Sequence, residues 1–156
     1  MSSAAFEEAF NLLCGEQIGY GMSRKVFACA LLPDCVVKVE EDPYRFQNIM
    51  EWETWDRVRW TPASRWFAEC RWISPNGRIL VMERTRPPGP ADLVEKVPVW
   101  FTDLKATNWG MAKSKNRDGT AAEKEWLVCH DYGTSLALQE GTVTKRLKKA
   151  EWIRPA

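Results

Sequence analysis

The chain has 156 residues and is 45% hydrophobic, which is enough apolar content for one domain with a core of its own. Its 22 basic and 21 acidic residues give a net charge of +1, so a protein that coats nucleic acid, which needs a strong basic excess, is not expected. The sequence has neither an apolar run of about 18 residues nor a basic and apolar N-terminal signal, and we therefore predict a cytoplasmic protein that neither spans a membrane nor is secreted.

The first sixty residues predict two helices with strands between them. Residues 3–13 are expected to be helical because apolar side chains recur at helical spacing. A second helix is expected over residues 43–60, since Pro43 favours a first helical turn and Pro62 pushes the residue before it out of the helical region. The intervening strands are expected at residues 16–20, 26–32 and 35–39.

The next segment predicts a hairpin. Residues 66–73 and 78–83 flank Ser74-Pro75-Asn76-Gly77, in which every residue favours a turn. Prolines in the segment 87–90 predict a stiff connector. The rest of the chain predicts a short helix over 91–96, loops from residue 99, a polar stretch over 113–120 and a strand over 126–129. This order of elements is typical of an α+β fold with an antiparallel sheet.

Cysteine, histidine and tryptophan limit the possible chemistry. The five cysteines are odd in number and none is spaced as Cys-x-x-Cys, which argues against a zinc or dithiol site and for buried thiols in a reducing compartment. His130 is the single histidine, so any histidine-based site depends on it. Most of the nine tryptophans are expected in a core or an interface.

Charge is unevenly distributed along the chain. Residues 1–53 carry a net charge of −5 and residues 140–156 carry +3. The basic run Lys145-Arg146-Leu147-Lys148-Lys149 is either a solvated helix face or a surface for an acidic partner, including the acidic half of a second copy.

Three residues of the first half are candidates for binding an anion, and a fourth is a candidate partner for one of them. Gly19 and Gly21 precede a strand, where their backbone N–H groups either bind a phosphate or simply allow a tight hairpin. Lys38 is surrounded by valines, so its ammonium either projects from a solvated sheet face or is neutralised by an anion. Glu51 shares its helix face with apolar residues, and we expect it to turn inward and meet Lys38.

Polar residues of the second half offer oxygen ligands. Asp103 and Asn108 lie in one segment with Lys105 between them, and Asp131 follows an apolar strand. Carboxylate and amide oxygens are ligands that hard cations accept, and the lysine favours a nearby phosphate. Each segment is equally compatible with an ordinary polar loop or turn.

The order of these features resembles the protein-kinase superfamily over residues 18–133. The features that carry the resemblance are, in chain order, Gly-x-Gly, a strand lysine, a helix glutamate, a hairpin ending in Val81-Met82-Glu83, Asp-x-x-x-x-Asn and Asp131-Tyr132-Gly133. The resemblance implies a kinase-like domain with a five-stranded antiparallel N-lobe sheet and one αC-type helix over residues 1–84. A hinge over 85–90 and a reduced C-lobe over 91–156 would follow.

The resemblance implies that the first half binds ATP. Gly19 and Gly21 would cover its phosphates. Arg24 stands where the family has a third glycine and would either reach a phosphate or obstruct one. Lys38 would hold the α- and β-phosphates and pair with Glu51. The residues expected at the adenine are Met82, Glu83 and Thr85.

The resemblance implies that the second half supplies the transfer chemistry. Asp103 would accept the proton of the substrate hydroxyl, and Lys105 would lie near the transferred phosphate. Asn108 and Asp131 would bind Mg²⁺.

Departures from the family pattern leave two main hypotheses. Phe101-Thr102 replaces the usual His-Arg before the catalytic aspartate, and the Ala-Pro-Glu motif is absent. The chain is therefore expected to be either a miniature ATP- and Mg²⁺-dependent phosphotransferase, of Ser/Thr or self-phosphorylating type, or a pseudokinase that binds nucleotide and acts as an interaction or inhibitory module. A small-molecule kinase and an α+β domain with accidental motif matches remain alternatives.

A reduced C-lobe is also expected to expose apolar surface. A protein substrate, another protein partner or a second copy of the chain would then cover the four tryptophans of this half. These tryptophans are Trp100, Trp109, Trp126 and Trp152.

Overall fold

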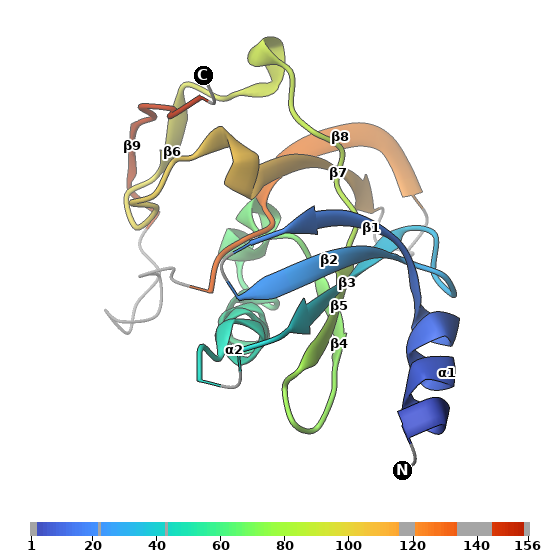
Figure 1. Ribbon diagram of the computed structural model, residues 1–156. Coiled ribbons are helices and arrows are strands. Elements are labelled where there is room, and N and C mark those ends of the chain that lie inside the picture. Colours follow the sequence, from blue (N-terminus) through green and yellow to red (C-terminus); the bar gives the residue numbers. More distant parts are fainter. Residues whose placement is uncertain (1–2, 22, 43, 116–120, 134–144, 155–156) are drawn as a thin grey trace. The chain divides into compact units, whose positions relative to one another are not determined.

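The computed structural model describes residues 3–21, 23–42, 44–115, 121–133 and 145–154 (Figure 1). The chain divides into two compact units, of which the first holds residues 1–52 and 70–84 and the second holds residues 53–69 and 85–156. The expected N-lobe over residues 1–84 thus differs in one segment, because residues 53–69 group with the second unit. Parts of the predicted polar stretch and of the C-terminal basic segment lie outside the described residues.

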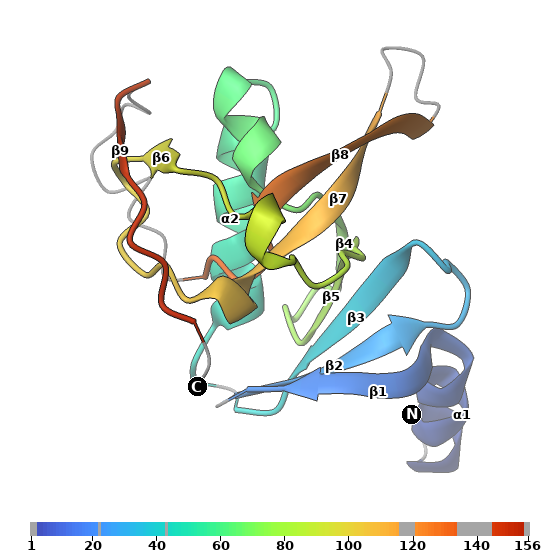
Figure 2. The same ribbon diagram turned by 90° about the horizontal axis from the view of Figure 1, so that it is seen from above.

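The first unit is built on a five-stranded antiparallel sheet in the order β1-β2-β3-β5-β4. β3 is its central strand, with β2 and β5 as neighbours, and Figure 2 shows β1, β2 and β3 side by side. The predicted α+β class and antiparallel sheet are confirmed. The strand bounds are β1 Cys14–Tyr20, β2 Arg24–Cys29, β3 Cys35–Glu40, β4 Cys70–Ile73 and β5 Ile79–Glu83.

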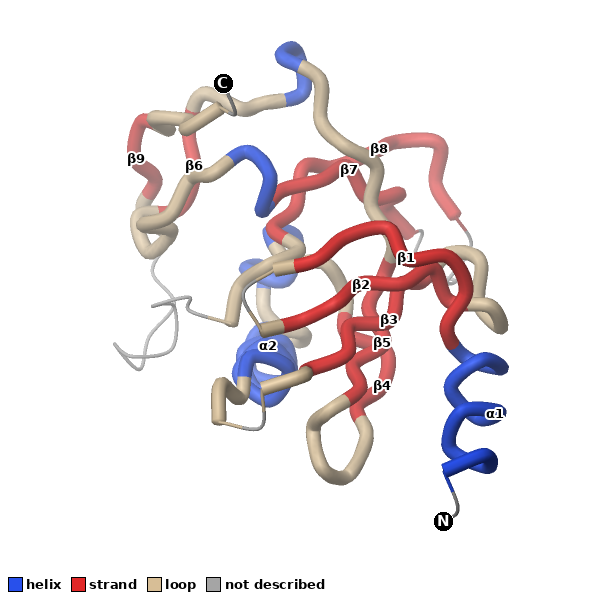
Figure 3. Tube along the Cα trace, in the orientation of Figure 1, coloured by secondary structure: helices blue, strands red, loops and turns tan. Residues whose placement is uncertain are grey.

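Two α-helices occur in the described residues, drawn blue in Figure 3. α1 spans Ser3–Leu13 as predicted, and α2 spans Gln47–Val58, shorter than predicted. α2 begins after Phe46, whose φ of 56° lies in the left-handed region and cannot continue a right-handed helix. Neither helix is long and apolar enough to cross a membrane.

The predicted hairpin is present as β4 and β5, with a shorter first strand than expected. Residues Pro62–Trp66 form a 3₁₀ helix, η1, so β4 begins only at Cys70. Gly77 closes the turn with a φ of 73°, and its N–H donates to the Ser74 carbonyl over 2.8 Å. A side chain at Gly77 would also overlap Ile49, so this turn requires glycine for two reasons.

The cysteines are buried, as predicted, and three of them lie in the core of the first unit. All five cysteines of the chain are free and buried. Cys14, Cys29 and Cys35 pack with Val37 and Val81 in the first unit. Burial raises the pKa of the Cys14 and Cys35 thiols to about 11, so both remain protonated at neutral pH.

Two small antiparallel sheets form the framework of the second unit. β7, Trp109–Lys115, pairs with β8, Ala121–Cys129, and β6, Lys96–Pro98, pairs with β9, Leu147–Lys149. The helix predicted over residues 91–96 is reduced to the 3₁₀ helix η2, Pro90–Asp92. The interpretation of the basic run as a helix face is wrong, because its residues 147–149 form strand β9.

Aromatic side chains form the core of the second unit. Trp109 is 1% exposed, and its ring lies 4.7 Å from Phe101 and 5.1 Å from Trp152. The expectation that four tryptophans of this half are exposed is wrong. Trp109 is buried and Trp100, Trp126 and Trp152 are half-buried, because these rings pack against one another, against Phe101 or against basic side chains.

Candidate functional site

A buried cluster of charged side chains centres on Glu51 in the first unit. The carboxylate of Glu51 is fully buried, and its Oε2 lies 2.9 Å from the Lys38 ammonium. The guanidinium of Arg24 donates to Oε1 of the same carboxylate over 2.6 Å. The expected pairing of Lys38 with Glu51 is therefore present, and Glu51 has a second cationic partner.

Neighbouring elements hold this cluster in place. Lys38 lies in the middle of β3, opposite Leu80 of β5, and Glu51 lies within α2. Asn48, which is also fully buried in α2, donates from Nδ2 to the Lys38 carbonyl over 3.0 Å and accepts from Arg24 over 3.2 Å. Asn48 was not among the residues predicted from the sequence, although its position three residues before Glu51 places it on the same helix face.

The two cations control the charge of Glu51. Burial by itself would raise the pKa of this carboxyl, but the charges of Lys38 and Arg24 and their hydrogen bonds lower it to about 2. Glu51 is therefore ionised at neutral pH. The cluster carries two positive charges and one negative charge in these three side chains.

The glycine segment forms a hairpin between β1 and β2. Gly19 lies in β1 opposite Val26, and the N–H of Gly21 donates to the Arg24 carbonyl over 2.7 Å. Neither glycine has a positive φ. The guanidinium of Arg24 is buried, and it donates to Glu51 and Asn48.

The residues expected at an adenine are divided between the units. Met82 is fully buried in β5 of the first unit, and Glu83 ends that strand half-buried. Thr85 belongs to the second unit, where it lines a pocket of about 330 Å³ that we call the connector pocket. The connector pocket is lined by Thr85, Pro87, Pro88, Ala106, Thr107, Trp109 and His130.

The second unit brings together three of the four residues predicted for transfer and metal binding. Asp103, Asn108 and Asp131 line one pocket of about 30 Å³, which we call the acidic pocket. Its volume exceeds the ~10–15 Å³ that one water needs, so it suits an ion rather than a nucleotide. Its other lining residues are Trp100, Phe101, Thr102, Cys129 and Tyr132.

The loop that carries Asp103 is held by a C-terminal segment and by aromatic packing. The N–H of Ala106 donates to the Ile153 carbonyl, and the N–H of Ile153 donates to the Leu104 carbonyl, both over 2.9 Å. Phe101 is buried in the aromatic core. Lys105 is exposed, and its ammonium lies 3.9 Å from the Asp103 carboxylate.

The acidic pocket contains carboxylate and amide side chains of the kinds that bind Mg²⁺ when a substrate provides the remaining ligands. The described residues contain no group of three or more His, Cys, Asp or Glu side chains that would hold a metal ion. Mg²⁺ commonly binds one or two carboxylates and completes its coordination with substrate phosphates and water. The carboxylate of Asp131 and the amide oxygen of Asn108 are compatible with that mode of binding.

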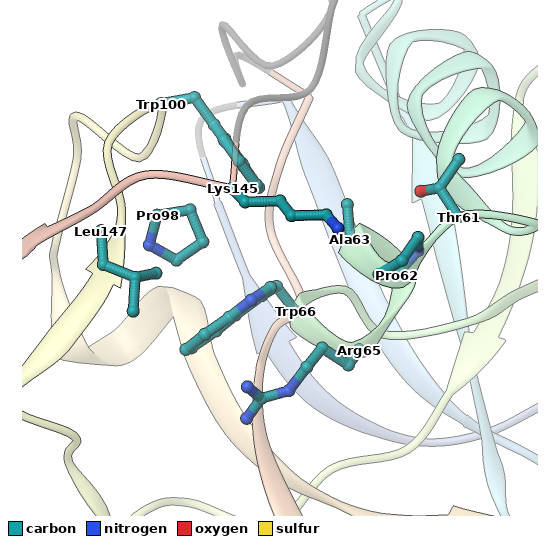
Figure 4. Close-up of a pocket in the computed structure, with 9 residues that line it drawn as sticks. All are labelled: Thr61, Pro62, Ala63, Arg65, Trp66, Pro98, Trp100, Lys145 and Leu147. Carbon is teal, nitrogen blue, oxygen red and sulfur yellow. The ribbon is translucent and has the colours of Figure 1, made fainter.

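A third pocket of the second unit, of about 260 Å³, contains none of the predicted site residues (Figure 4). It is mostly apolar, with Trp66, Trp100 and Leu147 among its lining residues. Figure 4 shows Lys145 extending toward Ala63, while the Arg65 guanidinium points away from the Lys145 ammonium. These two cations therefore do not form a single anion site.

Comparison of the chain with protein-family models, with curated proteins and with solved structures finds no match. The evidence for a function therefore comes from groups of residues within each unit. In the first unit these are the buried charges around Glu51, and in the second they are the polar residues of the acidic pocket.

Proposed function

We propose that the chain is a kinase-like phosphotransferase that uses ATP and Mg²⁺ to phosphorylate a Ser or Thr hydroxyl, or a hydroxyl of its own chain. The observation that carries this proposal is the buried pair of Lys38 and Glu51. A buried ion pair adds little stability compared with apolar residues of the same size. A lysine held rigidly by a glutamate is, in contrast, well suited to neutralise the phosphates of a nucleotide.

The acidic pocket would supply the residues of the transfer step. Asp103 is exposed, so its carboxylate is accessible to accept the proton of an acceptor hydroxyl. Asn108 and Asp131 would hold Mg²⁺, which when bound neutralises phosphate charge. Phosphoryl transfer depends mainly on such positioning and charge neutralisation, so these few residues would be sufficient.

Nucleotide binding tests whether both units act on the same ligand. Mg·ATP at 100 times its Kd should raise the free energy of unfolding by about 2.7 kcal/mol. Both Lys38→Met and Asp131→Asn should weaken Mg·ATP binding in calorimetry. Lys25→Met and Asp56→Asn, which change exposed residues, are the matched controls. Unchanged affinity in both site variants would refute the proposal.

Transfer of the γ-phosphate tests the role of Asp103. Asp103→Asn should reduce transfer from radiolabelled ATP, to the chain itself or to a Ser/Thr peptide library, by about 10²-fold or more. Its affinity for Mg·ATP should remain that of the wild type. Equal transfer rates in Asp103→Asn and the wild type would remove Asp103 from the mechanism.

One contact favours a second candidate, a nucleotide-binding module without transfer activity. The ammonium of Lys105 lies 3.9 Å from the Asp103 carboxylate, and this contact competes with an acceptor hydroxyl for the carboxylate oxygens. Mg·ATP binding by the wild type without transfer to any acceptor would support this candidate. Lys105→Met would then be the variant to examine for a gain of transfer.

A further inference from the structure

The acidic pocket and the connector pocket share a wall. Asn108 and Asp131 line the acidic pocket, whereas the adjacent residues Thr107 and His130 line the connector pocket. In each of the segments 107–108 and 130–131, one residue therefore lines the connector pocket and the next lines the acidic pocket. Any group that fixes this shared backbone also fixes the positions of Asn108 and Asp131.

His130 makes three hydrogen bonds across this wall. Its backbone N–H donates to the Asn108 carbonyl over 2.9 Å. Its Nε2 lies 2.9 Å from the Thr107 carbonyl, which can only accept, so Nε2 carries the proton. In the neutral ring Nδ1 then accepts from the Thr85 hydroxyl, which lies 2.8 Å away.

Gly110 provides the space for this arrangement. A Cβ atom at Gly110 would overlap the Thr85 hydroxyl and lie 3.0 Å from Nδ1 of His130. The absence of a side chain therefore allows Thr85 and His130 to meet next to β7.

We infer that His130 is a positioning residue that holds Asn108 and Asp131 in the geometry needed to bind a divalent cation. Its two N–H groups bind two successive carbonyls, those of Thr107 and Asn108, while its own backbone leads directly into Asp131. The part of this inference that concerns the cation rests on the proposed function. The two hydrogen bonds from His130 to the Thr107 and Asn108 carbonyls, which we call the clamp, lie within the second unit and are therefore testable without nucleotide.

The first test examines the clamp alone. Because His130 is the only histidine, ring nitrogen NMR signals are assigned without ambiguity, and we expect the tautomer protonated at Nε2 near neutral pH. In His130→Ala, amide hydrogen exchange of residues 106–110 should become about tenfold faster, as expected for loss of about one hydrogen bond. Exchange of residues 35–39 should not change, which excludes global unfolding.

The second test separates positioning from a merely structural role. His130→Gln retains a side-chain N–H for the Thr107 carbonyl and should restore most of the protection lost in His130→Ala. With Mn²⁺ and ATP, the Mn²⁺ concentration that half-saturates the protein, measured by electron paramagnetic resonance, should rise about tenfold in His130→Ala and much less in His130→Gln. Thr85→Val should resemble His130→Gln, and Thr85→Ser the wild type.

The outcomes separate failure of this inference from failure of the proposed function. A neutral ring protonated at Nδ1 instead of Nε2, or unchanged exchange in His130→Ala, would overturn the clamp. Faster exchange with unchanged Mn²⁺ affinity would overturn the positioning role. Absence of Mn²⁺ and nucleotide binding in the wild type would overturn both the cation part of the inference and the proposed function, while the NMR and exchange results would still decide the clamp.

Discussion

The ammonium of Lys38 and the carboxylate of Glu51 lie 2.9 Å apart, and both side chains are buried. Arg24 binds the same carboxylate, so three charged groups depend on one another in the interior of the first unit. Such a cluster tolerates the loss of Glu51 poorly, because both buried cations share its carboxylate.

Replacement of Glu51 should therefore be strongly destabilising. Glu51→Gln removes the carboxylate that the buried Lys38 and Arg24 share, and we expect the free energy of unfolding to fall by about 3–5 kcal/mol. Urea denaturation measures this change. Glu53→Gln alters an exposed residue of the same helix and should change stability by no more than about 0.5 kcal/mol. Equal stability of the two variants would contradict the cluster.

The stability of the chain should depend on pH through Glu51. Its pKa is about 2 in the folded state against an ordinary value of 4.5, so its contribution is complete above about pH 4.5 and is lost as the pH falls toward 2. The size of this contribution is about 3 kcal/mol. In denaturation curves between pH 6 and 2, the stability difference between wild type and Glu51→Gln should shrink. A constant difference would show that Glu51 is not held ionised.

The turn between β4 and β5 should reject a side chain at Gly77. Gly77→Ala places a Cβ in a left-handed conformation and against Ile49, which should cost about 2 kcal/mol or more. Gly21→Ala is the matched control, because the nearest atom to its added Cβ lies 4.0 Å away. Urea denaturation of both variants gives the comparison, and a Gly77→Ala variant as stable as Gly21→Ala would contradict the predicted strain.

The C-terminal segment should stabilise the loop that carries Asp103. The indole of Trp152 packs on Trp109 at 5.1 Å and donates to the Val94 carbonyl over 2.8 Å. Trp152→Ala should lower the free energy of unfolding by about 3 kcal/mol and speed amide exchange at residues 104–106. Trp60→Ala, which removes a tryptophan that is 84% exposed, should cost less than about 1 kcal/mol. Similar losses of stability in both variants would argue against a stabilising role of Trp152.

Local patterns predicted the first unit well. The helix over residues 3–13, the turn that ends at Gly77 and the inward orientation of Glu51 follow from apolar spacing and turn chemistry, which depend on a few neighbouring residues. The start of α2 was less predictable, because the left-handed φ of Phe46 is set by its surroundings.

The second unit was less accessible to sequence reasoning. The basic run over residues 145–149 has four charges in five residues and therefore little periodicity, so its sequence does not reveal that residues 147–149 form β9. That strand depends on pairing with β6. The tryptophans were expected to be exposed because their partners are distant in the sequence. Trp109, for example, packs on Trp66 and Trp152.

By itself, the sequence determined the α+β class, the antiparallel sheet and the pairing of Lys38 with Glu51, because hydrophobic periodicity and the cost of burying an unpaired charge are local or pairwise constraints. Only the tertiary structure decided that Arg24 and Asn48 join that pair, that Asp103, Asn108 and Asp131 share one pocket, and that His130 clamps its wall. These contacts join residues far apart along the chain, and no local pattern specifies them, because they arise only when the strands and loops have packed.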